Sequence, residues 1–309
     1  MKILGKSTIK GISSVYIAET ENKDGLIEFV DVEPVIDEKR IKKWVIILST
    51  QIGCPASCII CDAGGSFLRN LSLYELIFQV NYLVRKRKIN TTDIEKLKIQ
   101  FARMGEPSLN DAVIDAIVEL KKLYDNCIPC VSTIAPLGRE KWFNELNELR
   151  DEFYDFQMQF SIFTTDKKKR DEIIKFPIYD LDWISNFGEK FFRKGKRKII
   201  LNFPVNGEFP IDTDKINRIF SKESFIVKFT PINPTEKVKE QNILTKNYCN
   251  IVEDRIDEII CNLDKMGFDT IKSIGEMKEN IVGSNCGQSV VRMKMNMKID
   301  NFESTVEKS

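Results

Sequence analysis

The chain has 309 residues, with 42% hydrophobic and 30% charged side chains, a mixture that excludes an extended disordered protein. Lys and Arg number 47 against 46 Asp and Glu, so the net charge is close to zero. This argues against nucleic-acid binding through an overall positive charge. The absence of histidine excludes Cys/His zinc sites, histidine general bases and histidine nucleophile triads. No signal-like segment or long apolar run occurs, so we expect a cytoplasmic, soluble protein whose eight cysteines serve metal or redox chemistry rather than disulfides.

The first 43 residues predict a small β-rich extension. Strand-like content runs over 9–17 and 26–32, on either side of the turn-prone 21–25. From Trp44 the pattern changes to alternating strands and helices, which predicts βαβ units and a parallel sheet. We expect a barrel core over 44–290 and a loosely held polar tail over 291–309.

The core region predicts about six strands in βαβ units, with one more short strand near its end. Ser72-Leu73-Tyr74-Glu75 predicts a helix that starts with a capping box. The expected strands are 44–48, 97–102, 128–134, 156–163, 199–203, 225–229 and 270–274, and further helices are expected at 112–123, 139–149, 167–175, 180–193, 213–220 and 248–265. The fold class is therefore α/β, a partial (β/α)6 barrel whose functional loops follow the carboxyl ends of the strands.

The loop after the first core strand carries Cys54, Cys58 and Cys61 in the spacing C-x3-C-x2-C. Three thiolates at this spacing can hold three irons of a 4Fe–4S cluster and leave the fourth iron without a protein ligand. A zinc site is an alternative, and it needs a fourth ligand from a distant cysteine or a carboxylate. Unrelated core thiols are a third interpretation. An open iron binds a substrate or cosubstrate, so the spacing favours chemistry over a structural role.

This loop resembles the signature of radical S-adenosylmethionine (SAM) enzymes. Within that superfamily the chain resembles the RlmN/Cfr group, which methylates an adenine ring carbon of ribosomal RNA. The resemblance covers about residues 44–290, and its motifs recur in order. They are Ser49-Thr50-Gln51-Ile52-Gly53-Cys54, Arg69-Asn70-Leu71-Ser72, Met104-Gly105-Glu106-Pro107, Ser132-Thr133, Ser161-Ile162-Phe163, Asn233-Pro234 and Asn285-Cys286-Gly287-Gln288.

The resemblance implies a 4Fe–4S cluster on the three cysteines, SAM at its open iron, and an electron donor such as flavodoxin or ferredoxin. Glu106 would accept the SAM ammonium in a charge-assisted hydrogen bond, while serine and asparagine side chains satisfy the carboxylate and the ribose. Alone, each of these residues is an ordinary turn or cap residue. The residues implied to bind SAM are Gly105, Glu106, Ser132, Ser161 and Asn233.

Cys286 is the second reactive position that the resemblance implies. In the family, one SAM methylates this cysteine, and a second SAM provides the radical that abstracts hydrogen from the S-methyl group. The resulting carbon radical adds to the substrate, so the cysteine is a covalent relay. The alternative is a surface or semi-buried thiol without a role.

The chain departs from the family pattern at four positions. Ile47 stands where the family has a second cysteine, which removes a substrate proton and resolves the protein–substrate adduct. Ser13 replaces an acid, Phe163 a histidine, and Ile60 an aromatic residue. The N-terminal region is also shorter than the family's, where a helical accessory domain contacts RNA. We therefore expect the SAM and cluster machinery to be kept, and RNA docking and substrate deprotonation to be lost.

These features predict a radical SAM methyltransferase that acts through Cys286 on an unreactive carbon of a small molecule, nucleotide or peptide. The alternatives are a trimmed RNA methyltransferase, a radical SAM enzyme without the methyl relay, and a metal- or cluster-binding protein without turnover.

The remaining cysteines and the basic runs carry weaker predictions. Cys127-Ile128-Pro129-Cys130 enters a buried strand, where core packing competes with a thiol pair or an auxiliary metal site. Cys249 and Cys261 are expected to pack on the long helix. The basic runs 167–170 and 193–198 are interpreted as solvated helix ends and turns, with phosphate contacts as the alternative.

Overall fold

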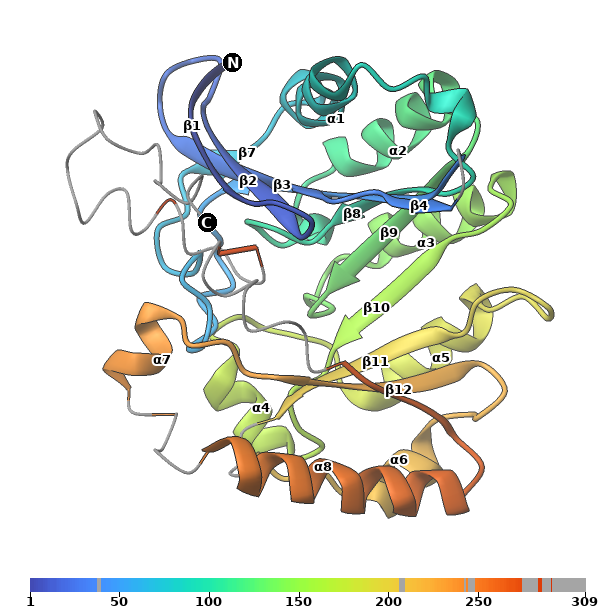
Figure 1. The fold of residues 1–309 in the computed structure, drawn as a ribbon. Helices are drawn as coiled ribbons and strands as arrows, with labels where there is room; N and C mark the ends of the chain where they lie inside the picture. The colour runs from blue at the N-terminus through green and yellow to red at the C-terminus, as the bar shows by residue number, and fades with distance from the viewer. Residues whose placement is uncertain are drawn as a thin grey trace.

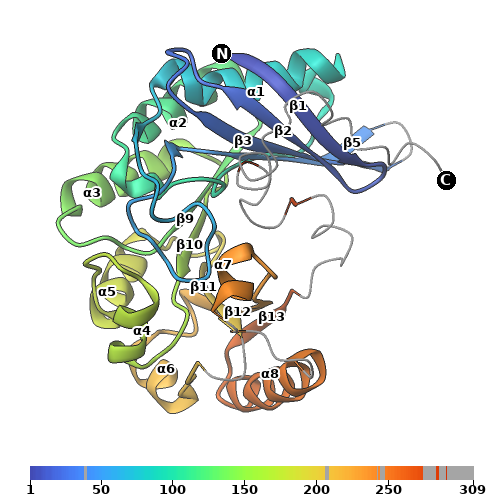
Figure 2. The same cartoon turned by 90° about the vertical axis from the view of Figure 1, so that its left-hand side faces the viewer.

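The computed structural model describes residues 1–37, 40–205, 209–241, 243, 248–273, 283–284 and 290. Among these residues, eleven strands form one curved sheet, and most helices lie along its outer face (Figure 1). Figure 2 shows helices α1 to α6 following the outside of this curve. The inner face of the sheet is therefore left to form a site.

The part of the sheet that follows the N-terminal extension is parallel throughout, and its spatial order follows the sequence. This order confirms the expected βαβ units. Six strands are each followed by a helix, and the short strand expected near 270 adds a seventh. The strands are β5 (Arg40–Leu48), β8 (Leu97–Phe101), β9 (Cys127–Thr133), β10 (Gln157–Ser161), β11 (Ile199–Val205), β12 (Phe225–Pro231) and β13 (Asp269–Lys272).

The helices cover the sheet with apolar faces and form the main core, in which Trp44, Phe101 and Phe160 are fully buried. The capping box predicted at Ser72 is confirmed, since Ser72 and Glu75 exchange side-chain and backbone hydrogen bonds. The helices are α1 (Leu73–Arg87), α2 (Ala112–Leu123), α3 (Glu140–Leu149), α4 (Lys167–Ile173), α5 (Leu181–Phe191), α6 (Thr213–Ile219), α7 (Glu236–Glu240) and α8 (Tyr248–Lys265). Short elements are η1 (Thr91–Asp93), η2 (Pro107–Leu109), η3 (Arg150–Glu152), β4 (Val35–Asp37), β6 (Gln51–Ile52) and β7 (Arg69–Asn70).

The N-terminal extension continues the same sheet. Strands β1 (Lys2–Ile9), β2 (Ser13–Glu19) and β3 (Leu26–Val32) pair antiparallel, and β3 pairs antiparallel with β5. The expectation of one strand over 9–17 is wrong, because residues 10–12 form a turn in which Gly11 has φ +79°. The core strand β5 also starts four residues before Trp44, where its first part pairs with β4.

Several residues of the two basic runs, 167–170 and 193–198, form hydrogen bonds or ion pairs within the protein. Arg170 is buried and donates to the backbone carbonyl of Tyr179 at 2.6 Å. Arg193 pairs with Asp151 at 2.8 Å. Other members of the second run pair in the same way, as Lys198 does with Asp269 at 2.6 Å. These contacts favour the interpretation as helix ends and turns over phosphate binding.

Cys261 is exposed on α8, so the expectation that it packs against the core is wrong.

Three other predictions concern residues outside the described part of the chain. The side chain of Cys249, the whole of Cys286 and the tail over 291–309 are not among the residues described. Within the described part of the chain, no helix combines the length and the apolar character that a membrane span requires.

Candidate active site

The cysteine loop leaves the sheet at the carboxyl end of β5, the edge at which parallel barrels carry their functional loops. Its backbone is closed on itself, because Gly65 N–H donates to the Cys54 carbonyl at 3.2 Å. At Gly53 the φ angle is +71°, and a Cβ atom would lie 2.0 Å from the Ser66 carbonyl oxygen. Only glycine fits this start of the loop.

The three predicted cluster cysteines share this buried loop, and their thiols are free. Burial raises the pKa of Cys54 to about 12, and repulsion from the Cys61 thiolate adds to the rise. Burial and the other two thiols likewise raise the pKa of Cys58. Among the residues that the structure describes, no three Cys, Asp or Glu side chains are gathered closely enough to hold a metal ion. The loop thus brings together the three thiols without arranging them as a finished metal site.

The segment after β12 binds the cysteine loop from the other side. Thr235 Oγ1 donates to the Ile60 carbonyl at 3.0 Å. The Asp62 carboxylate accepts hydrogen bonds from two backbone N–H groups in the first turn of α7, at 3.1 and 3.0 Å. Lys237 Nζ donates to a loop carbonyl at 2.8 Å. The Asn-Pro turn at Asn233, which immediately precedes these residues, is therefore held beside the cysteine loop.

Glu106 joins the loops that follow β8 and β9. Its Oε1 accepts from Ser108 N–H at 3.1 Å, from Ser108 Oγ at 2.7 Å and from Thr133 Oγ1. Its Oε2 accepts from Ile134 N–H at 3.0 Å. Burial raises the pKa of Glu106, and these donors counteract the rise. Because Oε2 has one donor among the described residues, it keeps a lone pair for a further donor such as an ammonium group.

Gly105 lets the β8 loop approach the start of the cysteine loop. Its φ is +98°, and a Cβ atom would lie 2.7 Å from both Thr50 Oγ1 and Gln51 Cβ. Across this contact Thr50 N–H donates to the Met104 carbonyl at 2.7 Å. Glu106 N–H donates to Gln51 Oε1 at 2.8 Å. The sequence Met104-Gly105-Glu106 is thus locked onto the residues that lead into the three cysteines.

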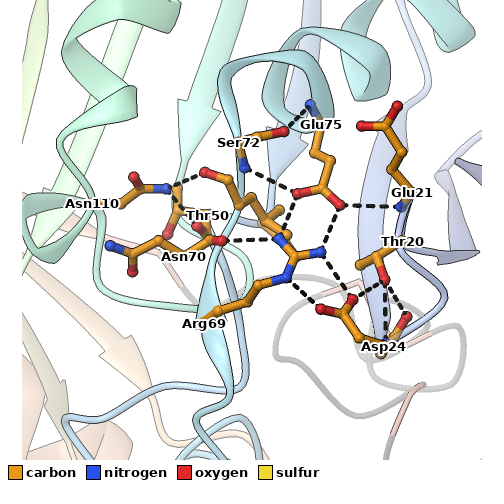
Figure 3. A network of polar contacts seen from close by, with 12 residues as sticks. Thr20, Glu21, Asp24, Thr50, Arg69, Asn70, Ser72, Glu75 and Asn110 are labelled. Atoms are coloured by element: carbon orange, nitrogen blue, oxygen red, sulfur yellow. Dashed lines mark hydrogen bonds and ion pairs between the residues drawn. The ribbon is translucent and has the colours of Figure 1, made fainter.

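Arg69 ties down the end of the cysteine loop (Figure 3). Its Nε and Nη2 atoms bind the Asp24 carboxylate at 2.6 and 2.9 Å, and its Nη1 and Nη2 atoms bind Glu75 at 2.7 and 2.9 Å. Glu75 also accepts from Ser72 N–H at 2.9 Å. Two bidentate pairs fix a guanidinium in both position and orientation. The loop end is therefore connected to the N-terminal extension and to the start of α1.

A cavity of about 400 Å³ lies against the inner face of the sheet. Ser132, Ser161 and Asn233, for which the resemblance implies SAM contacts, all line this cavity. Gly105 and Glu106 are not among its lining residues and lie beside it through their loop. Most of the other lining side chains are polar, among them Gln100, Gln157, Gln159, Asn202, Lys228 and Thr230.

Of the four positions that depart from the family pattern, Ile47 and Ile60 line this cavity, whereas Ser13 and Phe163 are not among its lining residues. Ile47 lines it and also packs against Val15 and Val30 of the extension, so apolar contact replaces the family's thiol. Ser13 is 1% exposed, and its hydroxyl oxygen has no hydrogen-bond partner among the described residues. Phe163 is buried at φ +67°, a conformation that bulky residues rarely adopt.

The C-x-x-C pair does not act as a pair. Residues three apart on a strand face opposite sides, so Cys127 packs in the main core while Cys130 lines the cavity. Both thiols are free. Core packing is confirmed for Cys127, whereas Cys130 presents a thiol to the candidate site.

Sequence reasoning missed a buried ion pair beside the cavity. Arg103 Nη2 lies 2.8 Å from Glu28 Oε1, and both side chains are buried. Arg103 also donates to the carbonyls of Ser284, at 2.6 Å, and Gly283. Val290 N–H donates to Glu28 Oε2 at 3.0 Å. The pair thus holds residues on both sides of the segment with Cys286. The available signal was the presence of two acidic residues, Glu28 and Asp31, in a buried strand.

No family model matches the chain, whereas curated sequences do. It is 30% identical over 198 residues to the probable dual-specificity RNA methyltransferase RlmN of Pseudothermotoga lettingae, which covers 61% of this chain and 54% of that protein. It is 26% identical over 268 residues to the dual-specificity RNA methyltransferase RlmN of Nautilia profundicola, which covers 82% of this chain and 73% of that protein. The chain thus spans about half the length of the first relative.

Among solved structures, SuiB from Streptococcus suis bound to S-adenosylmethionine matches with a TM-score of 0.51 and 11% identity, over 74% of this chain and 50% of that chain. SuiB bound to the precursor peptide SuiA matches with a TM-score of 0.52 and 12% identity, over 77% and 49%. Likeness at this identity shows the fold alone. The chain therefore shares the fold of these SAM-binding structures and is similar in sequence to proteins named as RlmN methyltransferases, which confirms the resemblance drawn from the motifs.

Proposed function

We propose that this protein is a radical SAM enzyme that passes a one-carbon unit through Cys286 to an unreactive carbon of a small molecule, nucleotide or peptide. The observation that supports this most is that the loops with the three cysteines, Glu106 and Asn233 meet at one edge of the sheet, beside the cavity. The relatives are named as RNA methyltransferases, which supports the same reaction class.

The cysteine loop fits a 4Fe–4S cluster by the chemistry of its donors, since it offers three free thiols and no competing disulfide. Cys54, Cys58 and Cys61 would hold the cluster, which when bound supplies the electron for SAM cleavage. The positive charge of Lys237 works against the burial that raises the pKa of Cys58 and Cys61. Lys237 therefore lowers the free-energy cost of ionising these thiols, and metal binding would offset the rest of that cost.

The positions of the side chains support the proposed SAM-binding roles. Glu106 has a free lone pair on Oε2 for the SAM ammonium, and Gly105 allows the close approach of its loop. Ser132, Ser161 and Asn233 share the cavity and offer hydroxyl and amide groups to the carboxylate and the ribose. Polar groups of this kind on a cavity wall orient a ligand rather than react with it.

The acceptor is proposed to be small. The cavity of about 400 Å³ is at the low end of the range that small ligands occupy. Because SAM would occupy part of the same cavity, the remaining volume favours a small acceptor group. Several members of the basic runs that an RNA backbone would need are engaged in ion pairs, among them Arg193 with Asp151 and Lys198 with Asp269. The ion-paired basic residues weigh against RNA as the substrate.

Isotope labelling tests the relay. We expect anaerobically purified protein, given SAM with a deuterated methyl group, to carry a labelled methyl on Cys286, as measured by peptide mass spectrometry. Replacing Cys286 with alanine should abolish methyl transfer, because the covalent carrier is lost. Production of 5′-deoxyadenosine is measured in parallel as the sign of SAM cleavage.

Cys261→Ala is the matched control, because this thiol is exposed on α8. It should leave labelling and transfer unchanged. Active enzyme with an unmodified Cys286 would contradict the relay. SAM cleavage without any labelled cysteine would instead point to a radical SAM enzyme that lacks it.

A further inference from the structure

Lys228 places a cation on the wall of the cavity without an acidic partner. Among the described residues, its side chain forms no hydrogen bond or ion pair. Burial and the nearby charge of Lys98 lower the pKa of Lys228, which shows that the surroundings disfavour its charge. Lys228 is only partly buried. A cation in such surroundings is usually paired, so one that lines a cavity without a partner among the described residues indicates a ligand with the opposite charge.

The charges of the described residues around the cavity match a ligand with one negative charge. The described residues that line it include two cations, Arg103 and Lys228, and no Asp or Glu. Arg103 is already neutralised by Glu28 at 2.8 Å. The uncompensated charge is therefore that of Lys228, which matches a single negative charge and leaves a doubly charged phosphate monoester half neutralised.

Asn202 supplies the second half of the site. It is the register partner of Lys228 on the neighbouring strand β11, and it is 7% exposed. Its Nδ2 atom lies 3.4 Å from Thr230 Oγ1, while its buried Oδ1 atom accepts no hydrogen bond in the described structure. A buried carbonyl oxygen without a donor costs free energy, which a ligand N–H or O–H would recover.

We propose that Lys228 and Asn202 form a subsite for the carboxylate end of the acceptor substrate. Lys228 donates to the carboxylate, and Asn202 Oδ1 accepts from an N–H or O–H on the adjacent ligand atom. Neighbouring strands lie about 4.8 Å apart, which suits two groups on adjacent atoms. The ligand class is an N-acylated amino acid, the C-terminal residue of a peptide or a 2-hydroxy acid. Its assignment as acceptor rests on the proposed function, whereas the carboxylate site itself does not.

Two probes that differ only in charge test the site. N-acetylglycine carries the carboxylate and the adjacent N–H, and N-acetylglycinamide is its neutral counterpart. Binding is measured by NMR titration of the anaerobically purified full chain. We expect N-acetylglycine to bind at least about tenfold more tightly than the amide, since a charge-assisted hydrogen bond is worth that much. Lys228→Met should remove this preference, and Asn202→Asp should remove it by repulsion.

Lys98→Met is the matched control. Lys98 is also partly buried in the barrel, but it donates to Gln157 Oε1 at 2.7 Å and is not among the cavity-lining residues. It should leave the preference intact. Equal binding of both probes to the wild type, or an unchanged preference in Lys228→Met with an unchanged urea midpoint, would overturn the site.

Competition with SAM shows whether the subsite binds the carboxylate of the acceptor or that of SAM. If SAM displaces N-acetylglycine, or if Lys228→Met weakens SAM binding, the subsite holds the SAM carboxylate and the acceptor assignment is overturned. Simultaneous binding of SAM and N-acetylglycine supports the assignment. If the wild type binds N-acetylglycine but neither binds nor cleaves SAM, the carboxylate site stands while the proposed function fails.

Discussion

Replacing Arg103 with methionine is expected to destabilise the protein by about 3–5 kcal/mol, because the Glu28 carboxylate is left buried without its cation. The two side chains are 2% and 0% exposed, so water cannot compensate the loss. Chemical denaturation measures the change. Hydrogen exchange at the Val290 amide, which donates to Glu28 at 3.0 Å, should quicken more than exchange in β8.

Arg87→Met is the matched control for this pair. Arg87 binds Asp31 at 2.7 Å on the same strand as Glu28, and Asp31 is 3% exposed. Its loss should also destabilise the protein, but it should leave Val290 exchange at the level of the rest of the sheet. The double change Glu28→Leu with Arg103→Met should recover part of the stability, because no charge then stays buried. Equal Val290 exchange in the two single variants would show that the pair does not hold this segment.

The fold was predictable where short-range chemistry decides it. Ser72 and Glu75 specify a helix start by themselves, and α1 begins there. The turn at Gly11 was missed because β-branched residues on both sides read as one continuous strand. Its φ of +79° is a backbone property that apolar patterning does not reveal.

The candidate site was predictable through its motifs but not through its interior. The order of the motifs brought Ser132, Ser161 and Asn233 to one cavity, because parallel strands end at one edge. The polar side of the cavity could also have been predicted from the sequence of β12. Lys228 lies between Val227 and Phe229, an alternation typical of a half-polar strand where parallel strands are usually apolar throughout. The Arg103–Glu28 pair joins residues 75 positions apart, and pairing at such separation is not encoded locally.

Replacing Arg69 with methionine is expected to cost about 2–4 kcal/mol and to loosen the end of the cysteine loop. Glu75 is 1% exposed and would lose its bidentate partner, while Asp24 would lose its anchor on the loop. Urea denaturation measures the stability. Iron content after anaerobic reconstitution reports on the cysteine loop, and it should fall because Arg69 no longer anchors the end of the loop to Asp24 and Glu75 (Figure 3).

The free energy of unfolding at acidic pH tests the pairs of Arg69 with Asp24 and Glu75 independently of iron binding. Hydrogen bonds from Arg69 hold the pKa of Asp24 far below its usual range. Burial opposes the ionisation of Glu75, but Arg69 together with the Ser72 and Glu21 backbone N–H groups outweighs it, so the pKa of Glu75 is also lowered. A lowered folded-state pKa stabilises the protein above the unfolded value, and this stability is lost as pH falls below about 4.5. Arg69→Met should therefore show a flatter curve there. Arg193→Met removes an exposed pair and should change stability by less than about 0.5 kcal/mol at any pH. Parallel curves for the wild type and Arg69→Met would show that Arg69 does not control these carboxylates.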